Sequence, residues 1–570
     1  MRKTSSFRWV YPSTKDSDIA CELAKAWNTN KVIAMLMHRR QLHSKDVLKA
    51  FFKPNLKDLH DPFTMKDMDV AVNRLKKAIK SQERIVFFGD YDVDGTTSVA
   101  LMKSFFSSRY HDFYTYIPDR YNEGYGLSKQ GIDWAINKGC RLMITLDCGI
   151  KSVSLVKYAQ ENGLDIIICD HHTPGETLPP AIAVLDPKRS DCRYPFKELS
   201  GCGVGFKLLC AYAKDQDIDI NEVFAHLDLL ALSIGADIVP IVGENRILAH
   251  YGMQRIRLSP CMGIAALTKV AKRHIRTIDD VVFTIAPRIN AAGRMAHGSE
   301  AVELLSTNDI ETANTLARQL DALNQQRRST DQNITKEAVD IIASRLDPDA
   351  ASTVVYNEDW HKGVIGIVAS RLVERFYRPT IVLTKSNGVY AGSARSVEGF
   401  DLYQALEKCE NELIQFGGHM YAAGMTVKAN NIEQFADRFE SVVSEQITPE
   451  QKIPQLNIDA ILPFSFIDDT LTNTLTQMQP FGPQNMKPVF VTRNLILGDD
   501  TRTVGSDNSH LKIEVIDPQT GESRMGIAFG WGEKMEALKN AEHLHLAYHL
   551  DENVWNGKSL WQLHVLDIDY

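Results

Sequence analysis

Short, continuous apolar runs dominate one part of the chain, and each of them ends just before an acidic residue. The three clearest runs are Ile85–Phe88 before Asp90, Leu142–Ile144 before Asp147, and Ile166–Ile168 before Asp170. Stretches with helical spacing separate these runs, and this alternation is typical of buried parallel strands in an α/β domain. Because functional groups collect at the carboxyl ends of such strands, we expect the acids at one edge of one sheet.

The pattern changes three times along the rest of the chain. From about residue 300 to 346, apolar residues recur at three- and four-residue spacing, which predicts a long helix between two domains. A second α/β unit begins at Thr353–Tyr356 and contains a glycine-rich turn at Gly417–His419. After Pro454, apolar and polar residues alternate, as in Leu511–Val515, which predicts a small β-barrel of the OB type. The first 50 residues are predicted to form a helical, basic arm.

The composition is that of a soluble protein with several domains. The chain has 570 residues, of which 44% are apolar and 24% are charged. Nine scattered cysteines without a C-x-x-C pair predict neither a disulfide framework nor a structural zinc site, and they fit a reducing cytoplasm. The longest apolar stretch, Leu227–Val242, is interrupted by Asp228 and Asp237, so we expect no membrane span, and no signal peptide is evident.

The formal net charge of −8 argues weakly against a nucleic-acid partner, because phosphates attract clustered Lys and Arg. Acids that are bound to metal ions would remove this objection, because basic grooves can exist elsewhere on the surface.

The densest candidate site lies in Gly89–Ser98, where Asp90, Asp92 and Asp94 alternate with other residues before Gly95. Such a set of oxygen ligands suits a hard cation. An EF-hand loop begins in the same way, but its twelfth position requires Glu, whereas this chain has Leu101. A solvated acidic turn is the structural alternative for this cluster taken alone.

Three weaker clusters become informative when they are combined with the first. They are Asp147-Cys148-Gly149, Asp170-His171-His172 and Gly235-Ala236-Asp237. Six aspartates and two histidines at one sheet edge would repel one another and shift their pKa values. Two divalent cations, about 3.5–4 Å apart in such sites, resolve the conflict and serve phosphoester hydrolysis. No Walker A sequence is present, which argues against a P-loop NTPase.

The succession D-x-D-x-D-G, D-x-G, D-H-H and G-A-D resembles the DHH phosphoesterase superfamily. Later motifs resemble the RecJ exonucleases within that superfamily: Pro287–Met295, Asn324–Arg328, Gly392–Ser396 and Phe416–His419. The stretch Pro480–Asn485 resembles the start of the OB-fold of that family, with Gln484 where glycine is expected. We expect this departure to lie far from the metal ligands.

The resemblance implies an α/β fold class with four folded parts. These are a parallel-sheet DHH catalytic domain, a long connecting helix, a second α/β DHH-associated domain and a C-terminal β-barrel with the OB-fold. With the N-terminal helical arm, the expected boundaries are 1–50, 51–300, 301–346, 347–446 and 447–570.

The resemblance also implies a ligand set for two Mn²⁺ or Mg²⁺ ions. One ion would be held by Asp90, Asp92 and Asp147, and the other by Asp94, Asp147, His171 and Asp237. Asp147 would bridge the two ions. His172 would face the scissile phosphate. Asp170 would accept hydrogen bonds from the histidines and so fix their tautomer and orientation.

Further residues are expected to contact the substrate. Those near the cut are Arg288, Asn290 and Arg294; those in the second domain are Ser393, Arg395, Gly417, Gly418 and His419; those at the terminal nucleotide are Arg109 and Tyr114. The arginines are also compatible with helix-surface ion pairs. Candidate stacking residues of the barrel, each also compatible with a core position, are Phe481, Phe490, Trp531, Trp555 and Trp561.

By resemblance, the function is that of an exonuclease specific for single-stranded DNA. The family implies 5′-to-3′ polarity, release of nucleoside 5′-monophosphates, and roles in DNA recombination and repair beside a helicase and single-strand-binding protein. A monomer is expected. The alternatives are another DHH enzyme acting on short oligonucleotides, cyclic dinucleotides or pyrophosphate, a non-enzymatic relative without metals, and a plain single-strand-binding protein.

Overall fold

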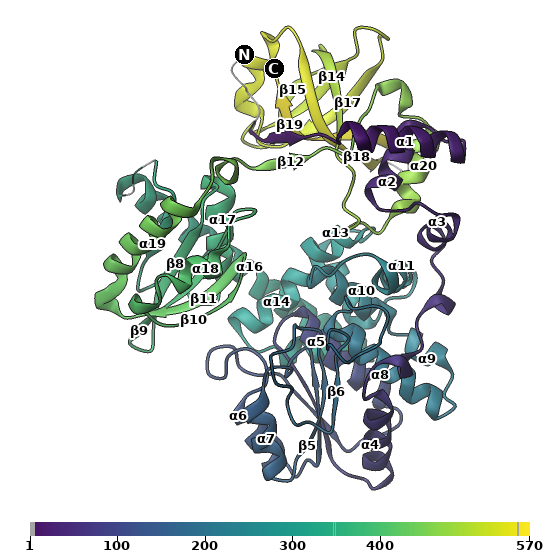
Figure 1. Cartoon of the computed structure of the whole chain (residues 1–570), viewed down its shortest axis with the longest axis vertical. Coiled ribbons are helices and arrows are strands. Elements are labelled where there is room, and N and C mark those ends of the chain that lie inside the picture. Colours follow the sequence, from purple (N-terminus) through teal and green to yellow (C-terminus); the bar gives the residue numbers. More distant parts are fainter. Residues whose placement is uncertain (1–5, 346, 348, 556–557) are drawn as a thin grey trace. The chain divides into compact units, whose positions relative to one another are not determined.

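The computed structural model describes residues 6–345, 347, 349–555 and 558–570. The chain forms two compact units, each of which contains segments that are distant in sequence (Figure 1). Unit 1 comprises Met1–Ser44, Arg328–Gln477 and Lys487–Tyr570, and unit 2 comprises Lys45–Arg327 and Met478–Met486.

Unit 2 is built on a five-stranded parallel sheet with the strand order β3-β2-β4-β5-β6. The strands are β2 (Ile85–Gly89), β3 (Phe113–Tyr116), β4 (Leu142–Leu146), β5 (Asp165–Cys169) and β6 (Ala183–Leu185). Strands β2 and β4 are buried over their whole length, which accounts for their continuous apolar sequences. The predicted buried parallel strands are therefore confirmed.

The helices of unit 2 pack on both faces of this sheet and against one another. They are α3 (Lys45–Phe52), η1 (Leu56–Asp58), η2 (Pro62–Thr64), α4 (Met68–Lys80), α5 (Val93–Phe106), α6 (Lys129–Asn137), α7 (Val153–Glu161), α8 (Gly201–Asp215), α9 (Ile220–Phe224), α10 (Leu227–Ala236), α11 (Gly243–Leu258), α12 (Met262–Ala271), α13 (Ile278–Asp280), the π-helical turn η3 (Val281–Ile285), α14 (Ala286–Met295) and α15 (Ser299–Ser306). Adjacent strand residues enter different cores: Phe87 packs with α5 and α8, whereas Phe88 packs with α6 and α7.

Helix α16 (Ile310–Arg345) connects the two units as one continuous element. The helix predicted from about residue 300 is interrupted before Ile310, because the Asp309 carboxylate accepts hydrogen bonds from the Thr312 amide and hydroxyl and starts a new helix there. In its second half, Asp331 is fully buried and forms an ion pair with Arg371 on α17 (Ile365–Phe376).

Unit 1 contains a five-stranded mixed sheet with the strand order β10-β11-β9-β8-β7. Its elements are β7 (Thr353–Tyr356), β8 (Thr380–Ser386), β9 (Val389–Arg395), α18 (Leu402–Glu407), η4 (Glu410–Glu412), β10 (Leu413–His419), β11 (Ala422–Val427), η5 (Ala429–Asn431) and α19 (Ile432–Gln446). The glycine-rich turn predicted at Gly417–His419 is wrong, since these residues continue β10 and pair with β11. Two glycines fit there because Gly417 faces Gly424 across the ladder and Gly418 lies close to Ala423.

The C-terminal part of unit 1 is a barrel with the strand order β13-β14-β18-β19-β17-β16-β15, closed by a pairing of β14 with β16. Its elements are η6 (Pro449–Lys452), β12 (Gln455–Asn457), β13 (Ala460–Ile461), η7 (Phe464–Phe466), α20 (Asp469–Met478), β14 (Phe490–Leu497), β15 (Arg502–Val504), β16 (His510–Ile516), β17 (Ser523–Ala528), η8 (Gly532–Lys534), α21 (Met535–Lys539), β18 (Leu544–Trp555) and β19 (Lys558–Asp569). The predicted small β-barrel is confirmed.

The N-terminal segment is not an independent arm. Strand β1 (Arg8–Val10) pairs in parallel with β12, and the Trp9 indole donates to Asp567 at 2.8 Å. The predicted helices are present as α1 (Thr14–Trp27) and α2 (Lys31–Arg39). Among the described helices of the whole chain, none combines the length and apolar character that crossing a membrane requires.

Candidate metal centre

The first acidic cluster lies where β2 ends and α5 begins. Asp90 follows the strand, and Asp92 caps the helix by accepting a hydrogen bond from the Gly95 amide at 3.1 Å. Asp94 lies in the first turn, where its carboxylate accepts from the amides of Gly201 at 2.7 Å and Cys202 at 2.8 Å. Those amides form the N-terminus of α8, whose dipole stabilises the negative charge of a carboxylate.

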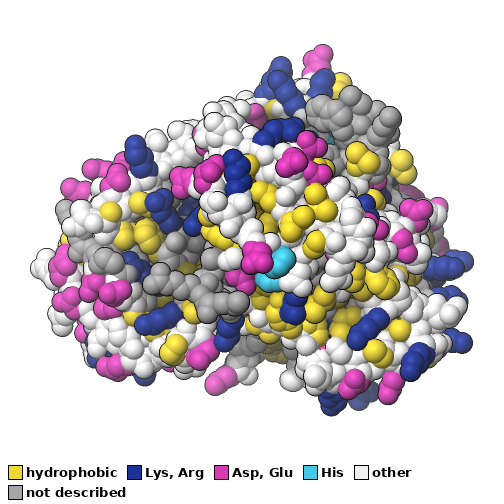
Figure 2. All heavy atoms as spheres, turned by 90° about the horizontal axis from the view of Figure 1, so that it is seen from above, with side chains coloured by type: hydrophobic (Ala, Val, Ile, Leu, Met, Phe, Trp, Pro, Cys, Tyr) yellow, Lys and Arg dark blue, Asp and Glu magenta, His cyan; other side chains and the backbone are white. Residues whose placement is uncertain are grey.

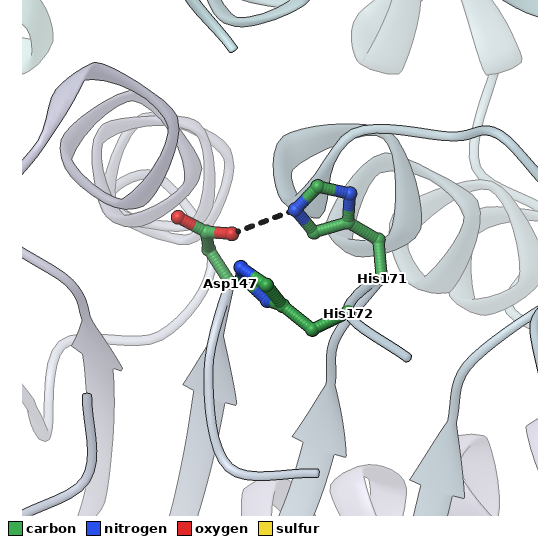
Figure 3. Close-up of side chains that lie close together, drawn as sticks. All are labelled: Asp147, His171 and His172. Carbon is green, nitrogen blue, oxygen red and sulfur yellow. Dashed lines mark ion pairs between the residues drawn. The ribbon is translucent and has the colours of Figure 1, made fainter. Parts of the chain in front are cut away.

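The other acids and His171 converge on the same place. Asp147 follows β4, His171 follows β5, and Asp237 lies at the C-terminus of α10. The His171 Nε2 atom is 3.1 Å from Asp147 Oδ1, the ion pair drawn in Figure 3. It is also 3.5 Å from Asp237 Oδ2 and 3.8 Å from Asp94 Oδ2. Ligand atoms bound to one divalent ion at about 2.1 Å are roughly 3 Å apart, so these separations fit shared cations.

Several buried polar atoms at this place have no hydrogen-bond partner. They are Asp90 Oδ2, Asp147 Oδ1 and both ring nitrogens of His171. Buried polar atoms without a partner are rare, and each of them calls for an explanation. Oxygen and imidazole nitrogen are ligands that Mn²⁺ and Mg²⁺ accept, so the residues present fit a divalent metal centre.

Burial and mutual repulsion favour the protonated form of Asp90, Asp147 and Asp237 when no cation balances their charge. Burial raises the pKa of Asp90 and Asp147 well above their ordinary value, and neighbouring aspartates raise it further. Burial, with the charges of Asp94 and Asp92, raises the pKa of Asp237 to about 8. Divalent cations would displace these protons and make the charged cluster stable.

His172 and Asp170 form a tightly bonded pair beside the cluster. Asp170 Oδ1 accepts from His172 Nδ1 at 2.7 Å, and Asp170 Oδ2 accepts from the Ile150 amide at 2.9 Å. Burial opposes charge on both groups, but their hydrogen bond outweighs it, lowering the pKa of Asp170 to about 2 and raising that of His172 to about 9. His172 therefore presents its Nε2 atom outward, 3.1 Å from the Tyr125 hydroxyl.

Tyr125 is a site residue that the sequence patterns did not reveal. It is 54% exposed, and its ring meets those of His172 and Tyr91 edge-on. Arg120 lies over the Tyr91 ring at 4.9 Å, so a cation and two aromatic rings border the metal ligands. The Gly126 amide, next in the same loop, donates to Asp90 at 3.0 Å. Because a loop has no periodic pattern of apolar residues, the only sequence signal here is the pair Gly124 and Gly126, which indicates a turn.

Arg109 and Tyr114 are not placed at this centre. Arg109 follows the C-terminal end of α5, and Asp94 lies at the other end of that helix of 14 residues, which spans about 20 Å. Its guanidinium pairs with Glu222 and lies over the Phe105 ring. Tyr114 is in β3, where it packs against Trp134. The structure therefore does not bring these two residues, which were expected to touch the terminal nucleotide, together with the metal ligands.

Helix α14 carries the three residues expected near the cut. Asn290 and Arg294 are one helical turn apart and half-buried, and the adjacent Gly293 packs against the Tyr91 backbone. Arg288 differs from them, because its guanidinium forms two 2.8 Å contacts with Asp321 on α16. A phosphate contact by Arg288 would have to compete with this ion pair.

Four of the five residues expected to bind nucleic acid in unit 1 share one face of its mixed sheet. Ser393 and Gly417 flank Gly424 across three strands, and Arg395 and His419 flank Ala422 in the same way. Gly418 lies on the opposite face, level with the buried Ala394. Arg395 donates to the Ser393 hydroxyl at 3.0 Å, which orients its guanidinium.

The candidate stacking residues of the barrel differ from one another in burial and in the unit to which they belong. Phe490 is fully buried and belongs to the core, whereas Phe529, which the sequence did not single out, is 55% exposed. Phe481 belongs to unit 2, and Trp531 and Trp561 are half-buried. The side chain of Trp555 lies outside the described residues.

Comparisons with known proteins agree with this arrangement of domains. Residues 84–234 match the DHH family, N-terminal domain, residues 341–445 match the DHHA1 domain, and residues 458–567 match the RecJ OB domain. The single-stranded-DNA-specific exonuclease RecJ of Bacillus subtilis is 36% identical over 567 residues, which cover 99% of this chain and 71% of that protein.

Solved structures give the same result. The crystal structure of RecJ from Thermus thermophilus in complex with Mn²⁺ is 27% identical, with a TM-score of 0.84 over 99% of this chain and 79% of that one. The corresponding Mg²⁺ complex has a TM-score of 0.79 over the same shares of both chains. With matching domains, matching order and this identity over most of its length, the chain belongs to the RecJ exonuclease family within the DHH proteins.

Proposed function

We propose that this chain is an exonuclease that degrades single-stranded DNA from the 5′ end and releases nucleoside 5′-monophosphates. The observation that carries the proposal is the convergence of Asp94, Asp147 and Asp237 on His171, within 3.8 Å of its Nε2 atom. Membership of the RecJ family supports the choice of substrate. DNA recombination and repair in the cytoplasm is the setting that we propose from the same family.

The proposed ligand assignment is the one that the family resemblance implies, and the contacts of His171 with Asp94, Asp147 and Asp237 support its second half. Asp90, Asp92 and Asp147 would hold one divalent ion, and Asp94, Asp147, His171 and Asp237 would hold the other. Two such ions, when bound, supply Lewis-acid activation of water and stabilisation of charge on the phosphoryl oxygens. Mn²⁺ and Mg²⁺ are supported by the solved relatives that contain them.

The chain's own residues would orient the substrate and stabilise its charge. His172, whose pKa is raised to about 9 by its bond to Asp170 despite burial, is protonated at neutral pH. Its Nε2–H would donate to a non-bridging phosphoryl oxygen and stabilise the charge that develops there. Asn290 and Arg294 would hold the adjacent phosphates from α14.

In unit 1, Ser393, Arg395 and His419 offer hydrogen-bond donors on one sheet face, and the barrel has the fold of single-strand-binding OB domains. On the face drawn in Figure 2, acidic and basic side chains are interspersed, so that face is not continuously acidic. We propose that the chain acts as a monomer beside a helicase and single-strand-binding protein.

The deciding experiment uses one single-stranded DNA labelled separately at its 5′ and 3′ ends. With Mn²⁺ present, we expect mononucleotides from the 5′ end, no release after chelation, and no digestion of blunt duplex. Activity confined to dinucleotides or pyrophosphate would place this chain's activity with other DHH enzymes instead. Binding of the strand without any hydrolysis would favour the binding-protein alternative.

A matched pair of variants tests the sheet face of unit 1. Arg395→Ala should weaken DNA binding and lower the slope of log affinity against log salt by about 1, because one phosphate contact is lost. Arg438→Ala, on helix α19, is the control and should leave the slope unchanged, since α19 packs against the core beneath the sheet. If the wild type and both variants have equal slopes, Arg395 does not contact a phosphate of the bound DNA.

A further inference from the structure

The loop that carries Asp237 is held in a strained conformation. Ile238, the next residue, has a φ of 58°, in the left-handed region that β-branched side chains rarely adopt. Its side chain is 67% exposed, so burial of that side chain does not offset the strain. A strained residue persists only where the surrounding structure fixes the backbone on both sides.

Three contacts fix this loop. The Asp237 amide donates to the Ser233 carbonyl at 2.9 Å, and the Asn245 side chain donates to the Pro240 carbonyl at 3.0 Å. The third contact comes from a distant part of the sequence, because the Ile241 amide donates to the Pro483 carbonyl at 2.8 Å. Pro483 lies in the segment Met478–Met486, which belongs to unit 2 although the chain on both sides of it belongs to unit 1.

Buried hydrogen bonds hold the segment Met478–Met486 in one conformation. The buried Asn485 side chain donates to the carbonyls of Met478 at 2.9 Å and Pro480 at 2.8 Å. Arg246, which is 3% exposed, donates to the Met478 carbonyl at 2.9 Å from the helix that follows the loop. A Cβ atom on Gly482 would lie 2.5 Å from Ile241 Cγ1, so only glycine allows this close approach.

The Pro480–Asn485 motif, whose Gln484 was expected to lie far from the metal ligands, bonds through the Pro483 carbonyl to Ile241, in the loop that begins at Asp237. Gln484 has a φ of 61°, in the left-handed region that favours glycine, which explains why glycine is expected at this position. The sequence could not reveal either point, because the motif and the loop are more than 200 residues apart and neither has a hydrophobic period.

We propose that the segment Met478–Met486 is a brace for the metal centre, and that Asn485 and Gly482 are positioning residues that act on Asp237 through Ile241. The inference rests on the proposed function in one respect, namely that Asp237 is a metal ligand. A brace that favours metal binding must in turn be tightened by the metal, because coupling between two sites is reciprocal.

The first test measures Mn²⁺ affinity by calorimetric titration of the chelator-treated, full-length protein without DNA. Asn485→Ala and Gly482→Ala should each raise the dissociation constant by about 10-fold, the lower end of the range for residues that orient metal ligands. The controls are Asn540→Ala, whose side chain bonds only within its own helix turn, and Gly521→Ala, which lies in unit 1 and strains a turn with a φ of 73° but meets no atom within 4 Å. Both controls should bind Mn²⁺ as the wild type does.

A second substitution distinguishes positioning from general damage. In the Asn485→Ala background, Ile238→Gly should restore part of the lost Mn²⁺ affinity, because glycine adopts a positive φ without strain and the loop then depends less on its brace. If the loss instead reflects partial unfolding, Ile238→Gly should not restore it.

A third measurement needs no variant. Hydrogen exchange of the wild-type protein should slow at the amides of Ile241, Gly482 and Asn485 when Mn²⁺ is added. Unchanged exchange there, or unchanged Mn²⁺ affinity in both brace variants, would overturn the brace and leave the proposed function intact. A wild-type protein that binds no Mn²⁺ would instead refute the metal site on which the proposed function rests.

Discussion

Asp147 combines an unusual backbone conformation with a buried carboxylate that its neighbours repel. It has a φ of 62°, it is almost fully buried, and its Oδ1 atom faces His171 at 3.1 Å without a hydrogen-bond partner. Strained backbone and a buried, repelled carboxylate both disfavour the metal-free fold. Their coincidence at one residue indicates that the site is shaped for a cation.

Asp147→Asn should therefore affect activity and stability in opposite directions. Turnover of 5′-labelled single-stranded DNA should fall on the order of 100-fold or more, because one ligand of both proposed ions is lost. The melting temperature in EDTA should rise, because one source of repulsion is removed. Activity above about a tenth of wild type would contradict the bridging role.

The Asp170–His172 pair gives a pH-dependent prediction. The pKa of His172 is about 9 in the fold, above its ordinary 6.5, so its stabilising contribution is complete below about pH 6.5 and is lost as the pH rises through 9. The pKa of Asp170 is about 2, below 3.8, so its contribution is complete above about pH 4 and is lost as the pH falls through 2.

Asp170→Asn should consequently destabilise the metal-free protein most between about pH 4 and pH 6.5. The difference in unfolding free energy between the wild type and this variant should narrow above about pH 9. The imidazole pKa of His172 should fall below its ordinary value, since burial then acts without the opposing carboxylate. Denaturant unfolding at several pH values and an NMR titration of the imidazole measure these effects. An unchanged imidazole pKa would show that Asp170 does not control the charge of His172.

At the scale of elements, the site depends on how closely helix α8 approaches β4. A Cβ atom on Gly201, the first residue of α8, would lie 2.5 Å from Asp147 Cβ and 2.7 Å from Asp147 Oδ1. The same N-terminus donates two backbone hydrogen bonds to Asp94. Its position therefore fixes one proposed ligand directly and leaves room for another.

Gly201→Ala should weaken Mn²⁺ binding by at least about 10-fold, because either the helix or Asp147 must move. Gly203→Ala in the same turn is the matched control, since its Cβ would meet nothing closer than 3.3 Å. Both substitutions raise helix propensity by up to about 1 kcal/mol, so their difference isolates the steric effect. Equal Mn²⁺ affinities, measured by titration calorimetry, would contradict the proposed close fit.

At the scale of the whole molecule, two compact units carry different parts of the proposed function. All six proposed metal ligands lie in unit 2, whereas Ser393, Arg395 and the OB barrel lie in unit 1. The chain crosses between the units after Ser44, along helix α16, and again on each side of Met478–Met486. Stability and metal binding are thus expected to be linked mainly within unit 2.

Differential scanning calorimetry should reveal this division. Removing metal with EDTA should lower the transition of unit 2 and leave that of unit 1 nearly unchanged. The pKa of Asp237 is raised to about 8, so the metal-free fold loses stability as the pH rises from about 4 to 8, and the gain from Mn²⁺ should be larger at pH 8 than at pH 6. A Mn²⁺ effect on both transitions alike would argue against a centre confined to unit 2.

The sequence by itself determined the parallel strands, the acids at their carboxyl ends and the barrel, because hydrophobic period and short motifs are local properties of the chain. Tertiary structure alone decided which loop residues join the site. Tyr125 reaches His172 from an irregular loop, and Arg109 lies at the far end of the helix that begins at the cluster. The brace at Met478–Met486 depends on contacts between residues distant in sequence, and no local pattern encodes such contacts.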